Sequence, residues 1–152
     1  MKHSSLFTTV ISIAALLFIV GCKKKTDDST PVSVTTIKGQ AKAELNLTVA
    51  GDENIPDGTK ITFLVNPNDL LNKPDTLNKY DSYRYTATVS SGQYTISVPA
   101  RNDGSPVKIV PDEFEAQLIL DNNGNTTRVV YSAPESVIII YAGSTEIYDV
   151  NY

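Results

Sequence analysis

The chain is poor in the side chains that most often carry reactions or bind metals. Its 152 residues include one cysteine, Cys22, one histidine, His3, and no tryptophan. A single thiol cannot form an internal disulfide, so a hydrophobic core must hold the fold together. Zinc sites and the common pairs of nucleophile and base also need Cys or His, neither of which occurs after Cys22. We therefore expect no enzyme, no metal site and no cofactor.

Only one long apolar run occurs, from Leu6 to Val20, and Lys2 precedes it. A membrane-spanning helix needs about 20 apolar residues, whereas this run has about 15. A basic start, an apolar centre of this length and a small residue at its end are typical of a secretory signal. The sequence therefore predicts a signal peptide over residues 1–21 rather than a membrane-spanning or buried core helix.

The apolar run ends in Ile19-Val20-Gly21-Cys22, which resembles the lipobox of bacterial lipoproteins. The resemblance implies cleavage between Gly21 and Cys22 and acylation of the cysteine thiol and of the new amino terminus. Several acyl chains, at about 0.8 kcal/mol for each buried methylene, would anchor the protein stably in a membrane. An Asp after the cysteine marks inner-membrane retention in that family. Lys23 here implies the outer membrane, and the charged residues that follow resemble a signal for display on the cell surface.

A polar segment, residues 22–33, follows the lipobox. It contains Lys, Thr, Asp, Ser and a single aliphatic residue, Val32, so it cannot bury enough surface to fold. We expect a flexible tether of about 11 residues after Cys22, with an average reach of about 18 Å. Loss of residues 1–21 removes one of the 13 basic and none of the 17 acidic residues, which changes the net charge from −4 to −5. Because nucleic-acid binding needs a basic face, we expect no nucleic-acid partner.

Beyond the tether, apolar and polar residues alternate. From Ile37 to Val49 the odd-numbered residues are apolar or small and the even-numbered ones are polar, which predicts a strand with one buried face. VIIIY, at 137–141, is apolar on both faces and predicts a central strand. Turn residues separate the runs, so we predict one domain, 34–152, folded as an antiparallel β-sandwich of about seven strands. The remaining alternating runs are 61–65, 83–89, 94–98, 114–120 and 129–133.

Residues 83–100, YRYTATVSSGQYTISVPA, resemble the repeat of prealbumin-like and carboxypeptidase-regulatory-like domains. The resemblance implies a hairpin that turns at Gly92, with Tyr94, Ile96 and Val98 facing the core and Pro99 ending the strand. Residues 55–65 and 37–39 are similar to the second and first strands of that family. No functional residue follows from the resemblance. An immunoglobulin-like sandwich with a different strand order remains an alternative.

Two segments are candidate sites. Asp121 to Asn125 spaces oxygen atoms like the start of a calcium loop, but Thr126 and Ser132 stand where an EF-hand loop needs Gly and an acidic residue, so a hairpin turn is favoured. The connection from Asn66 to Asp81, about 16 residues, is long for a sandwich, and such loops are often functional. We predict that it covers one end of the sandwich and forms a ligand surface. The residues predicted to form this surface are Leu70, Leu71, Leu77 and Tyr80.

These features together predict a monomeric, lipid-anchored envelope protein that binds a protein or glycan partner without catalysis. The alternative is a structural or assembly subunit of a fimbria-like surface structure. Lipoprotein precursors with prealbumin-like domains also build fimbriae, usually as two-domain chains that release an N-terminal strand after an Arg. The present chain has one predicted domain, and no Arg precedes Arg84.

Overall fold

The computed structural model describes residues 32–152, so the predicted signal peptide, Gly21 and Cys22 lie outside the described residues. Apart from one four-residue 3-10 helix, η1 (Pro67–Leu70), the regular structure of the described part is strand, which confirms the all-β prediction. In chain order the strands are β1 (Ser33–Ala43), β2 (Glu53–Asn54), β3 (Lys60–Val65), β4 (Tyr83–Thr88), β5 (Gln93–Ala100), β6 (Ser105–Pro111), β7 (Phe114–Ile119), β8 (Thr126–Tyr131), β9 (Ser136–Ile140), β10 (Thr145–Ile147) and β11 (Val150–Asn151).

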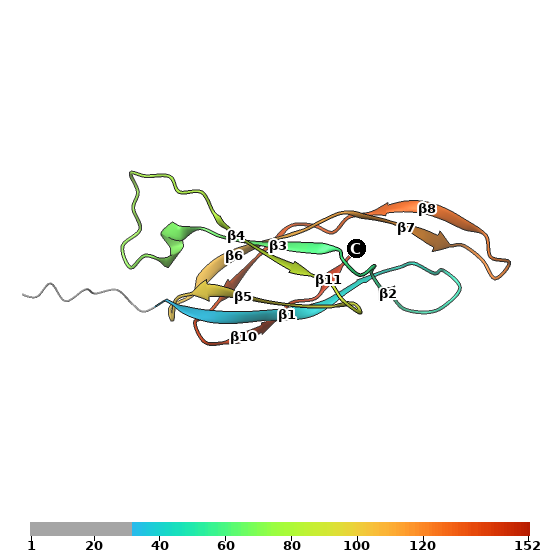
Figure 1. The fold of residues 1–152 in the computed structure, drawn as a ribbon, viewed down its shortest axis with the longest axis horizontal. Coiled ribbons are helices and arrows are strands. Elements are labelled where there is room, and N and C mark those ends of the chain that lie inside the picture. The colour runs from blue at the N-terminus through green and yellow to red at the C-terminus, as the bar shows by residue number, and fades with distance from the viewer. Residues whose placement is uncertain (1–31) are drawn as a thin grey trace, which may run out of the picture.

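The first sheet is built around β1 (Figure 1). β5 pairs antiparallel with its first eight residues, and β2 continues that side at Lys42 and Ala43. On the opposite side, β10 and then β11 pair with β1 in the parallel direction. Ile37, Ala41 and Ala43 are fully buried, as the alternation predicts for a strand with one inward face. The first strand of the domain is therefore held between strands from the middle and the end of the chain.

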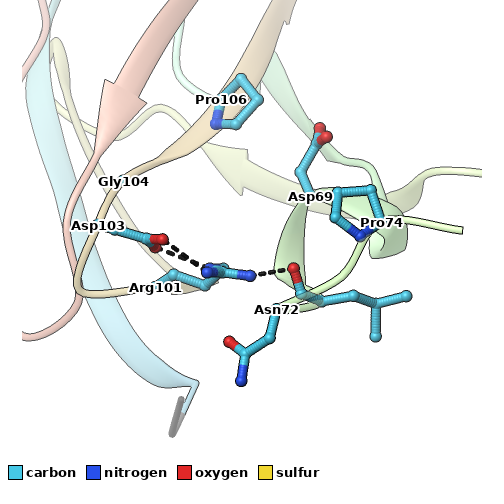
Figure 2. Close-up of a pocket in the computed structure, with 8 residues that line it drawn as sticks. Asp69, Asn72, Pro74, Arg101, Asp103, Gly104 and Pro106 are labelled. Carbon is cyan, nitrogen blue, oxygen red and sulfur yellow. Dashed lines mark hydrogen bonds and ion pairs between the residues drawn. The ribbon is translucent and has the colours of Figure 1, made fainter. Parts of the chain in front are cut away.

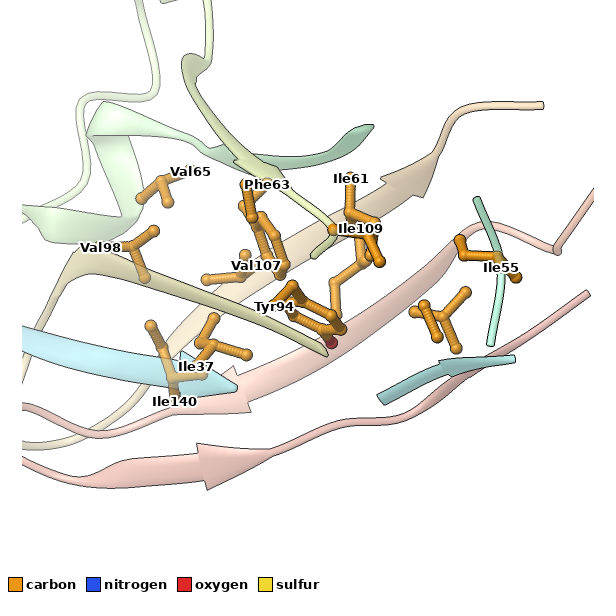
Figure 3. Packing of buried hydrophobic residues seen from close by; sticks show 14 of the residues in the cluster. Ile37, Ile55, Ile61, Phe63, Val65, Tyr94, Val98, Val107, Ile109 and Ile140 are labelled. Atoms are coloured by element: carbon orange, nitrogen blue, oxygen red, sulfur yellow. The ribbon is translucent and has the colours of Figure 1, made fainter. Parts of the chain in front are cut away.

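The second sheet is antiparallel, in the order β4, β3, β6, β9, and it packs against the first. Its inward face includes Ile61, Phe63 and Val65 from β3, and Tyr94 of β5 meets it from the first sheet with a ring-centroid distance of 5.9 Å to Phe63. Figure 3 shows these side chains from both layers meeting in one cluster. The two packed layers confirm the predicted β-sandwich.

β6, in the middle of the second sheet, was not predicted from the sequence. Proline is normally confined to sheet edges because it has no N–H to donate, and β6 contains Pro106 and Pro111. The register explains how both are accommodated. Pro106 would face Asn66, one residue beyond the end of β3, and Pro111 would face Pro134, before β9 begins. On their other sides Pro106 faces Ile139 of β9 and Pro111 faces Ile61 of β3. Neither proline interrupts a ladder, because the neighbouring strand is absent on the side to which its ring nitrogen points.

The predicted central strand at 137–141 is wrong, because β9 is an edge strand that pairs only with β6 among residues 32–152. Ile140 is fully buried, but Val137, Ile139 and Tyr141 are 63%, 52% and 49% exposed. An apolar run on both faces is typical of a strand covered on both sides, and here one face is open.

The alternation also overextends β1. The predicted strand ran to Val49, whereas β1 ends at Ala43, and Leu47 and Val49 are exposed in the turn that follows. In the alternating run 83–89, Tyr83 and Ala87 share one register, but the side chain of Tyr83 is exposed and that of Ala87 is buried. Sequence periodicity predicts the direction of side chains within a strand, but not where the opposing layer ends.

β7 and β8 form a separate hairpin that extends beyond the two sheets (Figure 1). Phe114 stacks on Tyr131 with ring centroids 5.1 Å apart and meets Tyr152 edge to face at 5.0 Å. A backbone bridge between Asn46 and Ile119 joins the hairpin to the segment after β1. The aromatic cluster fixes the hairpin to the end of the sandwich where β1 finishes.

The start of β1 lies at the opposite end of the sandwich. Ser33 pairs with Ala100, and the backbone N–H of Gly143 donates to the carbonyl of Val34 at 3.2 Å. In Figure 1 this end also carries the loop over residues 66–82, while the β7–β8 hairpin points the other way. We call the end at Ser33 the entry end of the sandwich.

Candidate functional site

The loop at the entry end begins with a capped 3-10 turn. The side chain of Asn66 accepts a hydrogen bond from the backbone N–H of Asn68 at 2.9 Å, and Pro67 occupies the first helical position, where no N–H is needed. Leu70 packs partly against the hydrophobic core. The beginning of the loop is therefore part of the sandwich architecture.

Asp75 organises the rest of the loop. The side chain of Asn68 holds the Asp75 backbone by accepting from its N–H at 2.6 Å and donating to its carbonyl at 3.1 Å. The Asp75 carboxylate accepts from the backbone N–H of Leu77, from the N–H and side-chain amide of Asn78, and from the hydroxyl of Tyr80 at 2.9 Å. These donors, the Asn78 amide first, lower the pKa of Asp75 to about 2. We call this set of contacts the Asp75 clasp.

The same clasp fixes Tyr80. Its hydroxyl donates to Asp75, and this hydrogen bond is the largest cause of a raised pKa for Tyr80. The ring remains about half exposed. Tyr80 is thus presented on the surface by a loop that is closed by its own polar contacts.

Arg101 connects the loop to the turn between β5 and β6. Its guanidinium donates to both carboxylate oxygens of Asp103, at 2.7 and 2.6 Å, and to the backbone carbonyl of Leu71. The arginine side chain is only 11% exposed. Its backbone is also fixed, because its N–H donates to Ser105 Oγ at 3.0 Å and its carbonyl accepts from Ala142. The loop is therefore held against the sandwich by one nearly buried cation.

A surface hollow of about 350 Å³ lies between the loop and this turn (Figure 2). Asp69 and Asp103 contribute carboxylates, and Asn72 contributes an amide. Because Arg101 is paired with Asp103, the hollow offers no free cation for an anionic ligand. Such a lining is suited to an uncharged ligand rich in hydrogen-bonding groups. The lining residues are Asp69, Leu71, Asn72, Pro74, Arg101, Asp103, Gly104 and Pro106.

The predicted ligand residues separate in the structure. Leu71 lines the hollow, Leu70 packs against the core, Tyr80 lies on the Asp75 clasp, and Leu77 is 92% exposed. Arg101 and Asp103 were not predicted as site residues. They lie in an Arg-Asn-Asp-Gly stretch whose only sequence signal is that of a turn, and Arg101 is 30 residues beyond Leu71.

Other polar groups that stood out in the sequence have structural partners. Asp121 accepts from the backbone N–H of Asn123 at 2.9 Å and from Asn125, which closes the hairpin turn as predicted. Glu115 forms an ion pair with Arg128 across β7 and β8. Within residues 32–152, no group of three or more His, Cys, Asp or Glu side chains is placed to hold a metal ion.

In the part of the chain that the structure describes, no helix has the length and apolar character needed to cross a membrane. Comparisons of the sequence with models of known protein families and with curated proteins gave no match. The functional assignment therefore depends on the chain's own residues.

Proposed function

We propose that the chain is a lipid-anchored cell-envelope protein whose β-sandwich binds a protein or glycan partner and carries out no catalysis. Acylated Cys22 is the proposed attachment point at the outer membrane, with the domain exposed at the cell surface. The observation that carries the binding role is the hollow that Arg101 maintains between the loop and the β5–β6 turn.

The chemistry of the hollow favours an uncharged polar ligand. The carboxylates of Asp69 and Asp103 accept hydrogen bonds, the amide of Asn72 donates and accepts, and Pro74 and Pro106 offer apolar surface. Sugar rings and extended peptides both combine hydroxyl or amide groups with apolar faces. Tyr80 does not line the hollow, but its hydroxyl donates to Asp75, the residue after Pro74, and its exposed ring adds an aromatic face to the same loop.

The position of the hollow favours a partner at the membrane surface. The hollow lies at the entry end, where β1 begins at Ser33, eleven residues after Cys22. A tether of that length keeps the entry end within about 40 Å of the bilayer even when fully extended. The proposed ligand is therefore an exposed segment of an envelope protein or a surface glycan close to the membrane.

The fimbria-like alternative is less well supported by the fold. Release of an N-terminal strand would remove β1, which pairs with four other strands and buries Ile37, Ala41 and Ala43 completely. Loss of a central strand would expose the core along the whole first sheet. Binding therefore remains the favoured proposal.

The anchor is tested by Cys22→Ser in the full chain. The change should abolish labelling by radioactive palmitate and leave an unprocessed precursor. Persistent labelling of Cys22→Ser would overturn the lipoprotein assignment.

The binding role is tested by replacing residues 72–79 with a short Gly-Ser linker, which keeps η1 and Leu70 in place. Binding to a glycan array, and cross-linking to envelope proteins, should be lost while the melting temperature stays within about 5 °C, since the deleted residues are mostly exposed. Replacing residues 47–51 with the same linker is the control, because that turn exposes Leu47 and Val49 at the opposite end. Equal binding by both variants would place the site elsewhere.

A further inference from the structure

The open edge of β9 presents unpaired backbone groups. The N–H of Asp112 donates to the carbonyl of Lys60 at 2.9 Å, so the even-numbered residues of β6 bond toward β3 and the odd-numbered ones toward β9. The β9 residues opposite those odd-numbered residues are Ser136, Ile138 and Ile140. The backbone N–H and carbonyl groups of Val137 and Ile139 therefore point away from β6, toward the open edge. β9 pairs with no other strand within residues 32–152.

The same two residues present apolar side chains. Val137 and Ile139 lie on the outer face of the sheet, and Tyr141 continues that exposed surface just beyond the strand. Ile139 and Tyr141 lie near each other around Gly104, since a Cβ at Gly104 would lie 3.0 Å from Ile139 and 3.2 Å from Tyr141. An edge strand with open backbone groups and apolar side chains is a template for another strand.

β9 also lacks the features that usually block such pairing. Charged residues, proline and bulges protect the edges of natural sheets. β4 carries Arg84, β8 carries Arg128 and β10 carries Glu146, whereas residues 136–141 contain no charge and no proline. The nearest charged residue in the sequence is Glu135, and it is paired at 2.5 Å with Lys108, which lies opposite Val137 on β6.

We propose that β9 pairs antiparallel with β9 of a second copy of this chain, about a twofold axis at Ile138. In this register Val137 lies opposite Ile139 of the second copy, and the two such pairs form about four backbone hydrogen bonds. The side chains on the outer face then meet as apolar pairs. Glu135 lies opposite Tyr141 of the second copy, so no like charges meet. The strand is complementary to itself and needs no change of fold to pair. This assembly differs from the monomer expected from the sequence, in which 137–141 was a covered central strand.

The predicted tether is long enough for both copies of the dimer to be anchored in one membrane. This point rests on the proposed lipid anchor, whereas the pairing of the two β9 strands does not. The hydroxyl of Thr35 donates to the carbonyl of Tyr141 at 2.5 Å, so β9 ends beside the start of β1. In the proposed register the two Tyr141 residues are six positions apart, about 20 Å along the strands. Each tether of about 11 residues spans up to about 40 Å. The antiparallel dimer therefore keeps both entry ends near its centre and sends the two β7–β8 hairpins outward.

Disulfide cross-linking of the full chain in cells tests the register. Val137→Cys and Ile139→Cys, carried by two differently tagged copies, should give a covalent heterodimer on oxidation, because their Cα atoms would be about 5.5 Å apart. Val137→Cys with Tyr141→Cys is the matched control, since both positions are similarly exposed but lie two residues out of register. The first pair should yield at least about five times more covalent dimer than the control, because Cα separations above 7 Å do not permit a disulfide.

The controls separate the two proposals. The wild-type chain has only Cys22, which cannot cross-link if it is acylated, so a disulfide-linked wild-type dimer would refute the anchor without bearing on β9. Equal yields from the two cysteine pairs, or no dimer from either, would overturn the β9 pairing. A thiol-independent measurement completes the test: Ile139→Lys should halve the mass of the detergent-extracted protein by light scattering, whereas Val130→Lys, at an exposed position of β8, should not. An unchanged mass for Ile139→Lys would also refute the dimer.

Discussion

Gly39→Ala tests how the end of the chain is fastened to β1. A Cβ at Gly39 would lie 1.8 Å from the carbonyl oxygen of Tyr148 and 3.1 Å from the hydroxyl of Tyr94. Carbon and oxygen normally approach to about 3.3 Å, so the Tyr148 carbonyl would have to move by about 1.5 Å. Two hydrogen bonds depend on the position of the Tyr148 backbone. Its N–H donates to the carbonyl of Lys38 at 3.0 Å, and its carbonyl accepts from the hydroxyl of Tyr94.

The expected loss follows from these contacts. Each hydrogen bond contributes about 1 kcal/mol net and costs more when a buried group is left unpaired, so Gly39→Ala should lower the free energy of unfolding by about 3 kcal/mol. At a urea dependence of about 2 kcal/mol per molar, the midpoint should fall by about 1.5 M. Residues 32–152 unfolded in urea and followed by circular dichroism provide the measurement. Gly124→Ala is the control, because its added methyl group meets nothing within 4 Å and carries only the backbone cost of a φ of +82°, about 1 kcal/mol. Equal midpoints for the two variants would show that the close approach at Gly39 does not hold the C-terminal strands.

Two further predictions concern the loop. Because the pKa of Asp75 is lowered, the clasp should be fully formed above pH 3.8, the ordinary pKa of Asp, and should be lost as the pH falls through about 2. A titration of the Asp75 carboxyl group followed by NMR checks this, and a titration midpoint near pH 3.8 would contradict the clasp. Arg101→Lys keeps the positive charge beside Asp103, but a lysine has no planar guanidinium that can donate to Asp103 and to the Leu71 carbonyl together. Amide hydrogen exchange over residues 71–75 should therefore become about tenfold faster, while the core strands stay protected. Unchanged exchange would mean that Arg101 does not hold the loop.

The strands of the sandwich were largely predictable because one face of each meets the core. Ile37 and Ala41, or Tyr94 and Val98, alternate with polar residues and are buried as expected. β6 was not predictable, since its two prolines are acceptable only because β3 and β9 stop short of them. The edge position of β9 was not predictable either, because an apolar run on both faces is typical of a covered strand, whereas within residues 32–152 no strand covers the outer face of β9.

The candidate site was predictable only as a segment. Length and leucine content identified residues 66–81, and the structure does place Leu71 in a hollow. The partners that shape the loop were not accessible from local sequence. Asp75 could have been a surface charge. Arg101 is brought to Leu71 by the pairing of β3 with β6, and the two residues are 30 positions apart in the sequence.

The parallel pairing of β1 with β10 and β11 bears on when the domain can fold. Among the strands of residues 32–152, β1 is the first to leave the ribosome, yet one of its two sides is completed by Glu146 and Val150, more than 100 residues later. Pairing over more than 100 residues carries a loop-closure cost before any contact compensates for it, so such topologies form slowly. The sandwich cannot close around β1 until β10 and β11 have been made. A chain still being synthesised therefore lacks the completed sandwich, which suits the proposed export, because a chain is threaded across a membrane unfolded. Loss of both β10 and β11 would leave β1 without a partner strand along one side.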